Sequence, residues 1–70
     1  MSERPRLLAM RALYDLRVVR APIVHDGYSA LLWTDDAEAV GVPGRPDVLD
    51  YRLTSRGRDL ARVAFEEGST

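Results

Sequence analysis

Residues 50–63 constrain the fold of this chain more than any other stretch, because a strand and a capped helix follow one another within fourteen residues, DYRLTSRGRDLARV. Tyr51 and Leu53 alternate with polar residues, which is the period-two pattern of a strand with one buried face. Val48 and Leu49 begin the same pattern. The sequence therefore predicts a strand over residues 48–53, with the rest of the chain packed against it.

The strand is followed at once by signals for a helix. Thr54 is a suitable N-cap residue, because its hydroxyl can accept a hydrogen bond from an amide two or three residues further on. Apolar residues then recur at helical spacing, which predicts a helix from about Ser55 to Glu67. Gly57 costs about 1 kcal/mol in a helix relative to alanine. Its presence indicates that another part of the backbone packs closely there.

The N-terminal part of the chain predicts a second helix, from Leu7 to Val19, with Pro5 suited to its first turn. One wide apolar arc of this helix is expected to face the core, and it comprises Leu8, Ala9, Ala12, Leu13, Leu16 and Val19. A second, narrower stripe consists of Leu7, Met10 and Tyr14. A chain of about seventy residues rarely covers two stripes, so we expect the second stripe to form an interface with a partner, such as a second copy of the chain.

The middle of the chain admits two interpretations. Asp26 and Gly27 lie between apolar runs, which favours a β-hairpin because glycine accepts a positive φ. Pro22 has no N–H group, so the first strand of such a hairpin would lie at a sheet edge or be confined to residues 23–25. The competing interpretation is a helix over residues 28–40. Trp33 would be an anchor in the core or in an interface.

Residues 41–47 contain two glycines and two prolines, which predicts a turn. The spacing Tyr-x-Leu-Thr-x-x-Gly-x-x-Leu that follows resembles the end of the winged-helix domain in bacterial regulators of the MarR, PadR and HxlR type. Tyr51, Leu53, Thr54, Gly57 and Leu60 carry this resemblance. With the turn as the wing tip, it covers about residues 38–63. It implies an α+β, winged-helix-like domain with an N-terminal helix, a short antiparallel sheet or wing and a C-terminal helix.

The resemblance also implies binding to DNA, as a bacterial or phage transcriptional regulator acting as a dimer. Arg45 at the wing tip would enter a minor groove, and three further arginines would meet phosphates, namely Arg52, Arg56 and Arg58. The chain departs from the family in one respect. About thirty residues separate the first helix from Tyr51, too few for two more full helices and a wing, so a recognition helix is shortened or absent.

The charge distribution limits how such a protein could hold DNA. The net charge of −1 divides into +3 for residues 1–22, −5 for residues 23–50 and +1 for residues 51–70. A nucleic-acid module usually carries a strong basic excess, so any binding would use local basic patches. The alternative function is a protein-protein interaction module built on the same scaffold.

Enzymatic and metal chemistry find little support in the sequence. His25 is the sole histidine and there is no cysteine, and we expect no catalytic residue, no metal and no cofactor. Asp35, Asp36 and Glu38 lack the spacing of a calcium loop, so we expect a solvated acidic face. No apolar run is long enough for a membrane span or a signal peptide. The sequence predicts one cytoplasmic domain over residues 1–70.

Overall fold

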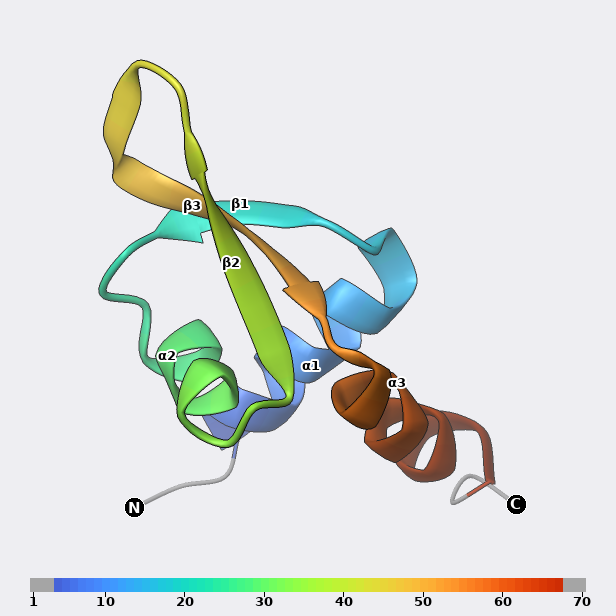
Figure 1. The fold of residues 1–70 in the computed structure, drawn as a ribbon. Helices are drawn as coiled ribbons and strands as arrows, with labels where there is room; N and C mark the ends of the chain where they lie inside the picture. The colour runs from blue at the N-terminus through green and yellow to red at the C-terminus, as the bar shows by residue number, and fades with distance from the viewer. Residues whose placement is uncertain (1–3, 68–70) are drawn as a thin grey trace.

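The structure, a computed structural model, describes residues 4–67 and has the α+β architecture that the sequence predicts. Three helices pack with one three-stranded antiparallel sheet (Figure 1). In chain order the elements are α1 (Arg4–Leu16), β1 (Val19–Pro22), α2 (Asp26–Trp33), β2 (Ala37–Val42), β3 (Arg45–Leu53), α3 (Ser55–Arg62) and η1 (Val63–Glu67). The last of these is a π-helical turn that continues α3.

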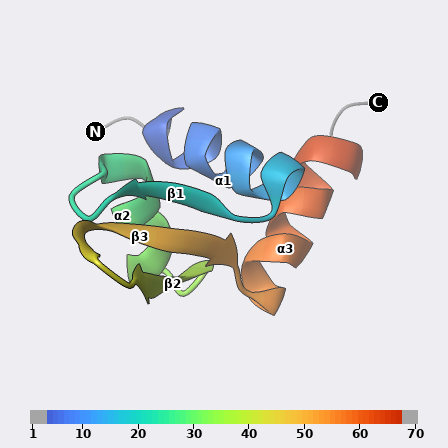
Figure 2. The same ribbon diagram turned by 90° about the horizontal axis from the view of Figure 1, so that it is seen from above.

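The sheet has the order β1-β3-β2, so the strand predicted over residues 48–53 lies at its centre. Tyr51 of β3 pairs with Val19 on one side and with Ala39 on the other. The strands β2 and β3 form a long hairpin whose turn contains Gly44 at a φ of 78°, a value that favours glycine. Both views place this turn at the end of the sheet opposite α3 (Figure 2).

The connection from α1 into the sheet differs from the prediction. The first helix ends at Leu16, and Val19 belongs to β1. Two β-branched residues in succession favour a strand over the last turn of a helix. Pro22 closes the edge strand β1, as its missing N–H group predicts.

The buried face of α1 lies between the two stripes that the sequence suggests. Ala9, Met10 and Leu13 are buried, because α2 and α3 contact the helix from different sides. Leu8 and Leu16, which we expected in the core, are exposed. The core therefore takes residues from both predicted stripes.

The prediction of a hairpin around Asp26 and Gly27 is wrong. These residues begin α2, whose N-cap is His25, with the ring Nδ1 accepting a hydrogen bond from the amide of Gly27 at 3.2 Å. Glycine is required there by packing, since an ideal Cβ atom would lie 2.3 Å from the carbonyl oxygen of Pro5 in α1. The competing helix is correct as far as Trp33, after which the chain enters β2.

The junction between β3 and α3 confirms the prediction made from residues 50–63. The Thr54 hydroxyl accepts a hydrogen bond from the amide of Gly57 at 3.1 Å and so caps α3. An ideal Cβ atom at Gly57 would lie 1.8 Å from the carbonyl oxygen of Asp36. The strand, the cap and the close backbone approach thus join α3 to the loop before β2.

The core is small and includes two tyrosines. Tyr28 and Tyr51 stack with their ring centroids 4.8 Å apart, and the Tyr51 hydroxyl donates a hydrogen bond to the carbonyl oxygen of Pro22 at 3.0 Å. Burial raises the pKa of both phenols. The stack links α2 to β3, and the hydrogen bond links β3 to the end of β1.

Candidate functional site

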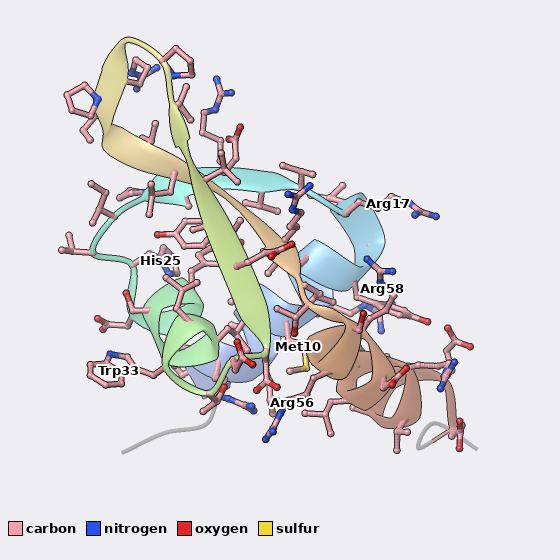
Figure 3. All side chains as sticks on the ribbon, in the orientation of Figure 1. Met10, Arg17, His25, Trp33, Arg56 and Arg58 are labelled. Atoms are coloured by element: carbon pink, nitrogen blue, oxygen red, sulfur yellow. The ribbon has the colours of Figure 1, made fainter. Side chains whose placement is uncertain are left out.

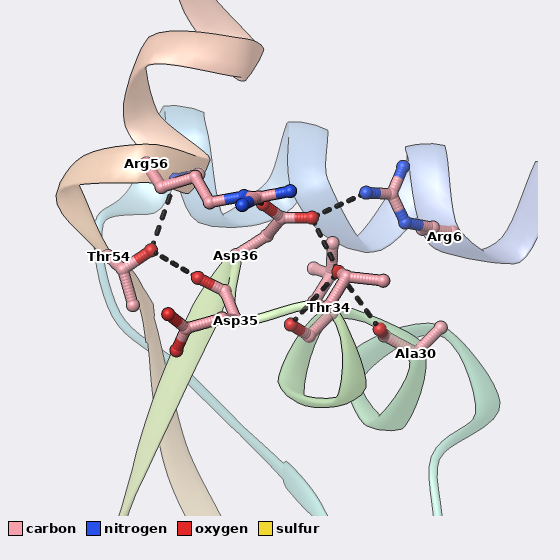
Figure 4. A network of polar contacts seen from close by, with 9 residues as sticks. Arg6, Ala30, Thr34, Asp35, Asp36, Thr54 and Arg56 are labelled. Carbon is pink, nitrogen blue, oxygen red and sulfur yellow. Dashed lines mark hydrogen bonds and ion pairs between the residues drawn. The ribbon is translucent and has the colours of Figure 1, made fainter.

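Asp36 is the one fully buried acidic residue in the part of the chain that the structure describes, with an exposed fraction of 0%. Its Oδ2 atom accepts hydrogen bonds at 2.5 Å from Arg6 Nη2 and from the Thr34 hydroxyl (Figure 4). Its Oδ1 atom accepts a hydrogen bond from Arg56 Nε at 3.2 Å. We call these four residues the Asp36 network.

The Asp36 network keeps a carboxylate charged inside the protein. Burial raises the pKa of Asp36, while hydrogen bonds from Thr34 and Arg6 lower it, as do the charge of Arg6 and the hydrogen bond from Arg56. The lowering effects prevail, so the pKa of Asp36 lies below its ordinary value. Since the donors come from α1, the end of α2 and α3, the network ties the three helices together. The expected solvated acidic face is wrong at this residue.

The arginines predicted to bind DNA are dispersed over the molecule. Arg45 lies at the wing turn, where its Nε atom is 3.4 Å from an oxygen of Asp47. Arg52, on β3, has its Nε atom 3.0 Å from an oxygen of Glu38 on β2. Both ion pairs are exposed, and exposed pairs contribute only about 0–1 kcal/mol. Neither pair prevents its arginine from turning to an external phosphate.

Arg56 and Arg58 have different surroundings although they are two residues apart on α3. A separation of two residues turns side chains by about 200° around a helix, and Figure 3 shows the two guanidinium groups on different sides of α3. Arg56 belongs to the Asp36 network. Arg58 lies on the same side of the molecule as Arg17 (Figure 3). The structure thus gives Arg56 an internal partner and leaves Arg58 toward solvent.

A cavity of about 550 Å³ lies between the end of α1, the end of β3 and the start of α3. We call it the arginine pocket, because three arginines from three segments line it. Its lining comprises Leu13, Tyr14, Asp15, Arg17, Val18, Arg52, Leu53 and Arg58. The lining thus brings three basic side chains together with apolar ones, among which Val18 is exposed.

Arg17 is the pocket residue that sequence reasoning missed. It follows α1 with a φ of 71°, and its amide donates a hydrogen bond to the carbonyl oxygen of Leu13 at 2.9 Å. Glycine is the usual residue in this left-handed position after a helix. The sequence placed Arg17 inside a helix extending to Val19. The Val18-Val19 pair is the signal that would have ended the helix earlier.

The stripe predicted as a partner interface lies largely inside the protein. Met10 is 2% exposed and belongs to the core. Tyr14 is half-buried against Phe65, with the ring centroids 5.8 Å apart. Leu7 remains 43% exposed. The prediction is wrong for Met10, because the packing of α1 against α2, α3 and the sheet buries this side chain. Of the three residues, only Leu7 offers a partner much surface.

Apolar side chains are nevertheless exposed elsewhere. Trp33, at the end of α2, is 88% exposed, so it is no core anchor. Leu8 is 61% exposed and lines a second cavity, of about 440 Å³, with His25 and Tyr28. Exposed apolar surface of this kind, where it is contiguous, marks sites at which proteins or ligands bind.

The histidine of the chain has a structural role, and the acidic side chains of the described residues form no metal-binding group. His25, the sole histidine of the chain, serves as the N-cap of α2. Among residues 4–67, no group of three or more acidic or histidine side chains is placed to hold a metal ion. None of the helices in this range has the length and apolar character needed to cross a membrane.

Comparisons with known proteins leave the family open. No protein-family model, curated protein or solved structure matches this chain.

Proposed function

We propose that this protein is a small winged-helix-like DNA-binding protein that contacts the DNA backbone and one groove. The observation that carries the proposal is the β2–β3 hairpin, which projects from the sheet with Arg45 beside its turn. The element order, with one short helix before a two-stranded wing, also agrees with the resemblance noted in residues 38–63.

The positions of the arginines in the structure change the set of DNA contacts that the sequence predicted. Arg45 enters a groove, while Arg52 and Arg58 meet phosphates. Arg56 is not part of this surface, because its guanidinium group is held by Asp36. The helix before the wing, α2, contains Asp26 and no basic residue, so phosphates would repel it. We therefore propose that the protein binds DNA weakly and that no helix reads much of the base sequence. We also propose that it acts in the cytoplasm of a bacterium or of a phage-infected cell.

Fluorescence anisotropy with labelled duplex DNA at low salt tests this proposal. With about three phosphates neutralised per chain, log K should fall against log salt with a slope of about −3, and a dimer should double it. Arg58→Ala should reduce the slope by about 1 and weaken all sequences alike, whereas Arg45→Ala should weaken AT-rich sites most.

Arg56→Ala is the matched control, because it removes the same charge from another side of α3. It should leave the salt slope unchanged in a protein whose circular dichroism shows that it is folded. Absence of binding at tens of micromolar protein, where non-specific binders register, would overturn the proposal.

A second candidate function is protein binding, and the exposure of Trp33 favours it. Tryptophan is enriched among residues that dominate binding energy in interfaces. A homodimer is the simplest case, and sedimentation at high concentration would distinguish it from a monomer of 7.8 kDa. If self-association uses this surface, Trp33→Ala should restore the monomer. If the wild type and Trp33→Ala are both monomers at high concentration, the hypothesis of self-association is refuted.

A further inference from the structure

The arginine pocket concentrates positive charge that the described residues do not neutralise. Within residues 4–67, Arg17 and Arg58 have neither an ion-pair partner nor a hydrogen-bond acceptor for their guanidinium groups. The one acid in the lining, Asp15, is bound to Arg11 at 3.0 Å. Arg52 shares its charge with Glu38 in an exposed pair. The fold thus brings two uncompensated cations and a weakly held third to one cavity.

The backbone at Arg17 points to the same site. A non-glycine residue in the left-handed region is disfavoured, and such outliers persist where the surrounding structure holds them. Glycine at this position would end α1 equally well. Arginine instead adds a cationic side chain to the lining of the cavity, on the same side of the molecule as Arg58 (Figure 3).

The shape of the pocket indicates what could bind. Its volume, about 550 Å³, is within the range of small-molecule sites and exceeds what a bare oxyanion needs. Val18 is 50% exposed and lines the same cavity with the half-buried Tyr14, so apolar surface is open to a ligand there. Guanidinium groups match phosphate oxygens in geometry and charge. The site therefore suits a phosphate with an organic group attached.

We propose that the arginine pocket binds a phosphate ester, with its oxygens on Arg17, Arg52 and Arg58 and its organic group against Tyr14 and Val18. The ester could belong to a free phosphorylated molecule or to a nucleic-acid backbone. The pocket shares Arg52 and Arg58 with the proposed DNA surface. Only the nucleic-acid source rests on the proposed function.

The test is a two-dimensional NMR titration of the ¹⁵N-labelled chain with phenyl phosphate, using sodium chloride at matched ionic strength as the reference. Saturable shifts of the Arg17 and Arg58 side-chain signals are expected. Arg17→Gly and Arg58→Gln should each weaken binding about tenfold, the effect of losing one charge-assisted contact. Arg45→Gln, at the distant wing turn, is the control and should bind as the wild type does.

Weaker binding by Arg17→Gly would not result from unfolding, because glycine suits the backbone there. The variant should melt no lower than the wild type. Shifts no larger than those with chloride, or equal weakening by Arg45→Gln, would overturn the proposal.

A second titration with a short DNA duplex separates the two sources. If phenyl phosphate binds and DNA does not, the pocket is assigned to a free phosphorylated molecule. The DNA-binding function is then refuted, and the pocket proposal stands. Binding of DNA that Arg17→Gly does not weaken, with no binding of phenyl phosphate, refutes the pocket alone. Weakening of both by Arg17→Gly supports both.

Discussion

The Asp36 network and the arginine pocket are two clusters built from the same residue type on different sides of α3. In the network, Arg6 and Arg56 hold a buried carboxylate with hydrogen bonds of 2.5 and 3.2 Å. In the pocket, Arg17 and Arg58 form no ion pair with any described residue, and the one acid of the lining, Asp15, pairs with Arg11. The position of one acid, and not the number of arginines, therefore separates a structural cluster from a candidate binding site.

The largest effect is expected at Gly57, where α3 packs against the backbone of the loop before β2. Gly57→Ala would place a Cβ atom 1.8 Å from the carbonyl oxygen of Asp36, which is backbone and cannot move aside alone. We expect a loss of about 3 kcal/mol in the free energy of unfolding, the upper range for overpacking. Urea denaturation measures it. Gly41→Ala is the control, because nothing lies within 4 Å of its Cβ position, and a similar result for both would contradict the close packing.

A second change removes the acid that distinguishes the clusters. Asp36→Asn keeps the shape but removes the charge that Arg6 and Arg56 share, and should cost about 2 kcal/mol at neutral pH. Because the pKa of Asp36 is lowered by folding, its contribution is fully present above the unfolded pKa of about 3.9 and is lost as the pH falls through the folded value.

The difference in stability between Asp36→Asn and the wild type should therefore shrink below about pH 4. Urea unfolding of both proteins from neutral to acid pH measures this. A difference that stays constant across that range would show that the charge of Asp36 does not stabilise the fold.

A third comparison uses the two arginines of α3. Arg56→Ala should destabilise the protein by about 1 kcal/mol, because the buried carboxylate of Asp36 loses one of its donors. Arg58→Ala should leave the stability within about 0.5 kcal/mol, since it removes no internal contact. Thermal melts of the two variants measure the difference. Equal losses would mean that Arg58 has a structural role after all.

The smallest expected effect lies at the backbone of the pocket. Arg17→Gly should raise the free energy of unfolding by about 0.5 kcal/mol, because glycine accepts the left-handed conformation. Arg17→Ala removes the same charge but keeps the disfavoured backbone. If Arg17→Ala is stabilised equally in urea denaturation, relief of charge repulsion is the cause and not the backbone.

Local sequence patterns predicted the parts of the fold that depend on interactions between neighbouring residues. The Thr54 cap, the strand over residues 48–53 and the edge position of Pro22 each depend on a few neighbouring residues. Gly57 in a helix predicted a close backbone contact, although the sequence did not indicate which residue makes that contact.

The parts that the sequence did not predict depend on residues far apart in the chain. Asp36 has the pattern of a surface acid, because its partners Arg6 and Arg56 lie thirty and twenty residues away. Gly27 suggested a turn, whereas the backbone of Pro5 is what requires it. The arginine pocket is likewise formed by three separate segments, so the spacing of its arginines in the sequence does not predict it.

The edges of the sheet limit how this protein can meet other chains. β1 has four residues and ends in Pro22, which offers no N–H group to a further strand. β2, at the other edge, changes register between Gly41 and Val42. Short, interrupted edges of this kind resist the addition of foreign strands and the aggregation that follows from it. A partner of this protein is therefore expected to be recognised by side chains and not by extension of the sheet.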